Sequence, residues 1–124
     1  MARKPSAALT DAEAEVMAIL WRIHPASVSD IVTAMNERRA VTYSTVQTIL
    51  RILETKGYVT HDKVARAFIY KPAVDARQAR LRALRHLVRR LFDGSPSLLV
   101  LNVLEDEELD AAEREQLRKL IERA

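Results

Sequence analysis

One stretch near the middle of the chain constrains the fold most, because its residues suit only an amphipathic helix. In residues 42–58, TYSTVQTILRILETKGY, apolar side chains recur at steps of three and four residues. The opposite side is polar and has no acidic side chain in its first three turns. The pattern predicts a helix that buries one face and leaves a hydroxyl- and amide-rich face free. The buried positions are Val46, Ile49, Leu50 and Leu53.

Residues that suit helix ends stand at both ends of this stretch. Thr42 precedes the apolar pattern and predicts an N-cap, because its hydroxyl can accept from a first-turn N–H. Gly57 predicts the helix end, since glycine adopts the left-handed conformation without a Cβ penalty. Lys56 suits the negative end of the helix dipole. We therefore expect the helix to end at about residue 56.

Two shorter helices are expected before it. Thr10 stands three residues before Glu13, and Ser27 stands three residues before Asp30, the arrangement of a helix cap. The pair His24-Pro25 ends the first apolar pattern, because a residue before proline avoids the α region. The turn between the second and third helices is then short, as in a helix-turn-helix unit.

Two segments rich in β-branched and aromatic residues follow, 58–61 and 67–71, separated by the charged residues 62–66. They predict a β-hairpin. Three helices followed by a hairpin form the winged-helix plan. We therefore expect a mainly α fold with a small β-hairpin: a winged helix-turn-helix domain over residues 1–74.

Residues 75–124 predict a second, helical region. A long helix is expected from Asp75 to about Phe92, then a turn, a short apolar helix over residues 98–104, and a final helix from Asp110. Their apolar faces exceed what the first domain needs, so we expect them to pair two copies in a homodimer. The expected dimerisation residues are Leu81, Leu84, Val88, Leu91, Leu99, Leu101, Leu104, Leu117, Leu120 and Ile121.

The charge is unevenly distributed along the chain. Residues 1–94 hold 16 basic and 9 acidic side chains, whereas residues 95–124 hold 4 basic and 8 acidic ones. The basic part favours a polyanion partner. The alternative is a pair of solvated helix faces without a partner.

The composition argues against catalysis, metal binding and membrane insertion. The 124 residues include no cysteine, and the three histidines, His24, His61 and His86, share no ligand spacing. No glycine-rich phosphate loop is present, so we expect no enzyme, no cofactor and no metal. The longest apolar stretch is far shorter than the about 20 residues that span a bilayer. Residues 1–8 lack the apolar core of a signal peptide, so a cytoplasmic location is expected.

On the winged-helix plan, the third helix enters the major groove of DNA. Arg51 and Gln47 are the expected base readers, because a guanidinium matches guanine acceptors and an amide matches adenine. Lys63 and Arg66 in the hairpin would neutralise phosphates. Tyr43 either contacts sugar or a thymine methyl, or packs inside the protein. Further expected contacts come from Thr42, Ser44, Thr45 and Thr48.

Four stretches together resemble the BlaI/MecI/CopY family of winged-helix repressors. They are residues 9–13 with 16–17 and 20–21, residues 45–50, residues 53–58 and residues 66–72. Residues 97–104 are similar to the family's dimerisation region. The resemblance implies a homodimer that binds a pseudo-palindromic operator, blocks transcription and is released by a signal.

In one branch of that family the signal is a sensor protease, which cuts after an asparagine followed by phenylalanine. Asn102 matches, but Val103 replaces the aromatic residue, and the asparagine also has a plain interpretation as a helix-surface residue. The copper-responsive branch senses metal through cysteines, which this chain lacks. Ala65 stands in the hairpin where relatives often have glycine.

A winged helix can also serve as a protein-interaction module without specific DNA binding, since fold alone does not settle function. Retention of a specific fragment in a gel shift against genomic DNA distinguishes the two. The acid-free polar face over residues 44–51 favours DNA.

Overall fold

The computed structural model describes residues 8–124; residues 1–7, most of the segment expected to lack a signal peptide, lie outside them. The chain divides into two compact units, residues 1–84 and 85–124. The division lies within one helix, α4 (Ala76–Leu91). The domain boundary predicted after residue 74 stays a prediction.

The first unit begins with three helices, α1 (Asp11–Ile23), α2 (Val28–Asn36) and α3 (Tyr43–Lys56). The predicted caps of α1 and α2 are confirmed. The hydroxyls of Thr10 and Ser27 accept from the backbone N–H of Glu13 and Asp30, and both carboxylates accept in return from the cap residues. These reciprocal bonds satisfy backbone donors that a helix N-terminus otherwise leaves unpaired.

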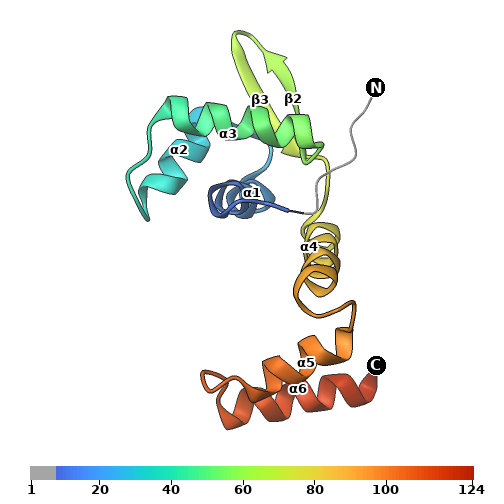
Figure 1. The fold of residues 1–124 in the computed structure, drawn as a ribbon. Coiled ribbons are helices and arrows are strands. Elements are labelled where there is room, and N and C mark those ends of the chain that lie inside the picture. The colour runs from blue at the N-terminus through green and yellow to red at the C-terminus, as the bar shows by residue number, and fades with distance from the viewer. Residues whose placement is uncertain (1–7) are drawn as a thin grey trace. The chain divides into compact units, whose positions relative to one another are not determined.

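A three-stranded antiparallel sheet completes this unit, with β1 (Ala26–Ser27), β2 (Val59–Val64) and β3 (Ala67–Pro72) in the order β1-β3-β2. The predicted hairpin is confirmed, but its first strand is longer than expected. Val64 still pairs with Ala67, so the turn has only two residues. Strand β1 was not predicted, because two residues are too few to show an alternating pattern. Figure 1 shows the β2–β3 hairpin projecting beyond α3.

The core of the first unit lies between α1, α2, α3 and the sheet, and it also includes Ala79 from the start of α4. Its largest fully buried side chains include Met17, Leu20, Leu50 and Tyr58. The indole Nε1 of Trp21 in α1 donates to the Val74 carbonyl at 2.9 Å. This bond fixes the segment after β3 against α1.

The second unit contains the end of α4 with α5 (Pro96–Glu105) and α6 (Ala111–Arg123). Ser95 and Asp110 cap α5 and α6, and Arg114 Nε donates to the Leu104 carbonyl at 3.0 Å. Within residues 96–105 and 111–123, no side chain is buried. The fold is mainly helical with a small sheet, as predicted. None of the helices in residues 8–124 is long and apolar enough to cross a membrane.

Candidate nucleic-acid interface

Helix α3 has one buried face and one exposed face, as its pattern predicts. Val46, Ile49, Leu50 and Leu53 are buried. The opposite side carries exposed polar groups, because the same 3.6-residue period places them together. Ser44, Thr45, Thr48 and Arg51 are exposed, Tyr43 is 51% exposed, and Gln47 is half-buried.

Several hydroxyls on this face already have partners inside the helix. The Thr42 hydroxyl accepts from the Thr45 N–H at 3.2 Å and lies 2.9 Å from the Thr45 hydroxyl. The Thr48 hydroxyl donates to the Ser44 carbonyl at 2.9 Å. As placed, Thr48 can accept from an outside donor but has no proton left to give to a phosphate.

Three other polar side chains on α3 remain available for contacts with a partner. Within residues 8–124, the side chains of Tyr43, Gln47 and Arg51 make no hydrogen bond or ion pair. A phenol, an amide and a guanidinium together supply both donors and acceptors. They are therefore the groups of α3 best able to contact base edges.

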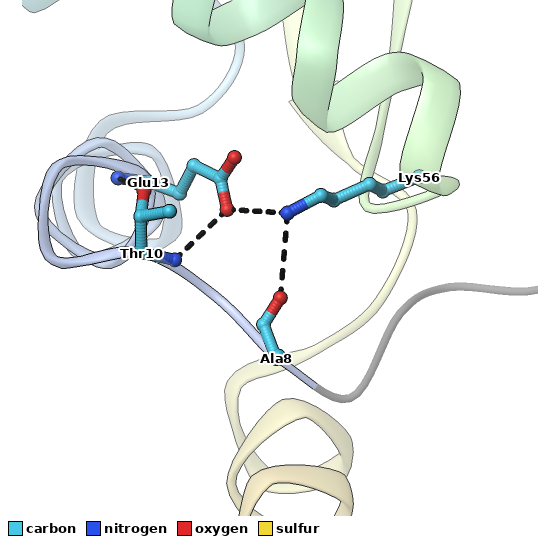
Figure 2. Close-up of polar contacts among 4 residues, drawn as sticks. All are labelled: Ala8, Thr10, Glu13 and Lys56. Carbon is cyan, nitrogen blue, oxygen red and sulfur yellow. Dashed lines mark hydrogen bonds and ion pairs between the residues drawn. The ribbon is translucent and has the colours of Figure 1, made fainter.

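A buried ion pair holds the C-terminal end of α3 against the start of α1 (Figure 2). Lys56 Nζ lies 2.7 Å from Glu13 Oε1 and donates also to the Ala8 carbonyl at 3.4 Å. The same carboxylate oxygen accepts from the Thr10 N–H at 2.9 Å. Glu13 is only 4% exposed. These contacts fix the position of α3 relative to α1.

Opposing effects act on the Glu13 carboxyl. Burial by itself raises its pKa, but hydrogen bonds from Lys56 and Thr10 and the charge of Lys56 outweigh it, so the pKa is lowered. Glu13 is therefore ionised at neutral pH and pairs with the lysine as a true ion pair.

The hairpin places two basic side chains beside α3 in the same unit. Lys63 lies in β2 opposite Phe68, and Arg66 lies in the turn; both are exposed. Ala65, the other turn residue, has φ 57°, which is the left-handed region that disfavours a residue with a Cβ. The chain thus makes this turn without the glycine it favours.

Two residues that the sequence analysis did not place at the interface connect the hairpin to α3. His61 Nδ1 lies 2.6 Å from Glu54 Oε1, and the imidazole stacks on Phe68 with ring centroids 4.3 Å apart. No local pattern predicts this contact, because Glu54 belongs to a helix and His61 to the next strand. It depends on the turn at Gly57, where φ is 87°.

The expected dimerisation and cleavage residues lie in both units. Most of the apolar ones are exposed or half-buried, but Val88 is only 7% exposed within one chain. Asn102 and Val103 are exposed in α5, and the Asn102 amide donates to the Leu98 carbonyl at 2.8 Å. The roles predicted for these residues stay predictions.

Three helices and a β-hairpin, with a polar third helix beside a basic wing, define a winged helix-turn-helix protein. The solution structure of the DNA-binding domain of the repressor BlaI is similar, with a TM-score of 0.54 at 29% identity over 60% of this chain and 92% of that one. The monomeric form of Bacillus licheniformis BlaI in complex with the blaP half-operator is also similar. Its TM-score is 0.50 at 30% identity, over 57% of this chain and 87% of that one.

A family model described as penicillinase repressor matches residues 9–123, and the chain belongs to this family. The penicillinase repressor of Bacillus licheniformis is 28% identical over 114 residues, which are 92% of this chain and 89% of the relative. The methicillin resistance regulatory protein MecI of Mammaliicoccus sciuri is 28% identical over 113 residues, 91% of this chain and 92% of the relative. The resemblance stated from the sequence is confirmed; the family is one of repressors, which are not a class of enzymes.

Proposed function

We propose that the chain is a sequence-specific transcriptional repressor that binds a pseudo-palindromic DNA operator as a homodimer. The observation that carries the proposal is the polar face of α3, where the side chains of Tyr43, Gln47 and Arg51 make no hydrogen bond or ion pair within residues 8–124. Membership of the penicillinase repressor family supports it, as does the similar BlaI structure, which is in complex with a half-operator.

In this proposal α3 enters the major groove and Arg51 and Gln47 contact base edges. Tyr43 contacts the sugar or a thymine methyl. Lys63 and Arg66 neutralise phosphates beside the groove and provide affinity without sequence information. The hydroxyls of Thr42, Ser44 and Thr45 add contacts to phosphates or bases, and the Thr48 hydroxyl accepts from a donor on a base.

Two copies would pair through the second unit, each presenting one α3 to one half-site. Exposed apolar side chains on α5 and α6 support this, because residues such as Leu101, Leu120 and Ile121 are at least half exposed in the single chain. A two-fold dimer reads two half-sites related by the same symmetry. The operator is then pseudo-palindromic, and the repressor works in the cytoplasm, where the DNA is.

We further propose that a sensor protease releases the repressor by cutting between Asn102 and Val103. Both residues lie in the middle of α5, which has no buried side chain. A protease that binds an extended segment has to unwind this helix first, and within one chain no buried side chain of α5 holds it in place. Cleavage in α5 would also break the dimer contacts proposed for this helix. Incubation with the cognate sensor protease is the test. A band of full-length protein after induction would contradict cleavage between Asn102 and Val103.

Selection of genomic fragments by the full-length protein at moderate salt tests the main proposal. We expect a small set of fragments that share an inverted repeat. Retention of no specific fragment would instead favour a winged helix that binds a protein partner.

A further inference from the structure

Glu54 is the one acidic residue of α3, and it stands three residues after Arg51. Side chains three apart on a helix are neighbours, so an unrestrained Glu54 carboxylate would pair with the Arg51 guanidinium. The described residues, 8–124, contain no ion pair between Arg51 and Glu54. Glu54 Oε1 instead lies 2.6 Å from His61 Nδ1 in the hairpin. His61 therefore binds the Glu54 carboxylate, which would otherwise pair with the Arg51 guanidinium.

The orientation of the His61 ring is fixed by its aromatic neighbours. Its centroid is 4.3 Å from that of Phe68, nearly parallel at 24°, and 5.4 Å from that of Tyr70. Both neighbours come from β3, the strand paired with β2. Stacking of this kind restricts ring rotation, so Nδ1 is held toward Glu54.

Arg51 and Glu54 are close enough to form an ion pair with one another. Both line an open groove of about 500 Å³ between α3 and the hairpin, together with Thr55, His61, Phe68 and Tyr70. Burial raises the pKa of the Tyr70 hydroxyl, the Glu54 carboxylate raises it further, and the Arg51 guanidinium lowers it. The same hydroxyl thus senses both charges.

We propose that His61 is a positioning residue for DNA recognition: it holds the Glu54 carboxylate away from Arg51 and leaves the guanidinium available to base edges. This inference rests on the proposed function, because it needs Arg51 to read DNA. Without the imidazole, the Glu54 carboxylate pairs with the Arg51 guanidinium. The guanidinium fork is then occupied by a carboxylate and no longer matches the two acceptors of a guanine.

The test uses the full-length protein and fluorescence anisotropy with two duplexes. One is a duplex that the wild type selects from a random pool, and the other is its scrambled counterpart. His61→Ala weakens binding to the selected duplex by about five- to tenfold, while binding to the scrambled duplex stays within about twofold. His61→Asn, whose amide can donate from near the Nδ1 position, retains more of the affinity than His61→Ala.

The rescue variant separates charge control from simple loosening of the hairpin. In His61→Ala/Glu54→Gln the carboxylate is gone, so affinity for the selected duplex returns to within about twofold of the wild type. If the double variant stays as weak as His61→Ala, the histidine acts only as a structural strut and the inference is wrong. Wild-type affinity in His61→Ala also overturns it. A wild type that prefers no duplex overturns the proposed function itself, and the inference with it.

Discussion

Replacement of Lys56 by methionine tests how the fold fixes the position of α3. Methionine keeps the unbranched length and the helix propensity of lysine but removes the ammonium group. Glu13, which is 4% exposed, then keeps a buried carboxylate whose remaining donor in the interaction shown in Figure 2 is the Thr10 N–H. The variant therefore leaves a nearly buried charge without its counter-charge.

The magnitude follows from the burial of the two partners. Removing one member of a buried ion pair costs about 3–5 kcal/mol of stability. The Lys56 side chain is 25% exposed, so water reaches the space that it leaves. We therefore expect a smaller loss of stability, about 2–3 kcal/mol. Glu13→Gln is the matched control. Its amide oxygen still accepts from Thr10 and Lys56, and its effect is about 1 kcal/mol.

The effect of Lys56→Met also depends on pH. In the wild type the folded-state pKa of Glu13 lies below its ordinary value of 4.5, so the contribution to stability is present above that pH and is lost as the pH falls through the folded pKa. Without Lys56 the burial effect dominates and the folded pKa rises above the unfolded one. Protonation then favours the folded variant, so the difference from wild type shrinks between pH 7 and about pH 4.

Urea unfolding followed by the fluorescence of Trp21, the single tryptophan, measures these differences. All variants are compared at one protein concentration, because the proposed dimer would add to apparent stability. In Glu13→Gln/Lys56→Met the loss is smaller than in Lys56→Met alone, since no buried charge remains. A loss below about 1 kcal/mol for Lys56→Met, or a loss that grows in acid, would show that Lys56 does not stabilise the fold as the counter-charge of Glu13.

Three further predictions concern the hairpin and the second unit. Lys63→Ala weakens binding to selected and scrambled duplexes alike and lowers the slope of log K against log salt by about one, measured by anisotropy titrations over a salt series; an unchanged slope contradicts a phosphate contact. Ala65→Gly raises the free energy of unfolding by about 0.5–1 kcal/mol in urea titrations, because φ at Ala65 is 57°, and a loss of stability would contradict strain there. Leu120→Glu shifts the protein from dimer to monomer in sedimentation velocity, since this residue is 53% exposed in the single chain, whereas Gln116→Glu on the same helix does not.

Local signals in the sequence predicted the elements of the first unit well. The caps at Thr10 and Ser27, the N-cap at Thr42 and the glycine end at Gly57 are all as expected. Each depends on residues within about one helical turn, where the spacing of side chains settles the geometry. The exposed face of α3 follows in the same way from its 3.6-residue period.

Contacts between distant residues could not be predicted in this way. Glu13 has the position of a capping-box acid, yet it also pairs with Lys56, 43 residues later. His61 faces Glu54 only because the chain reverses at Gly57, and β1 exists only because Ala26 and Ser27 meet β3. The tertiary fold creates these pairs, and the sequence pattern around each residue is satisfied without them.

Binding of Arg51→Ala to both duplexes tests most directly whether α3 reads base edges. We expect a loss of about 1–3 kcal/mol in binding free energy on the selected duplex and a much smaller loss on the scrambled one, so that the preference between them falls. Equal losses on both duplexes would contradict base reading by α3, because Arg51 would then contribute only charge.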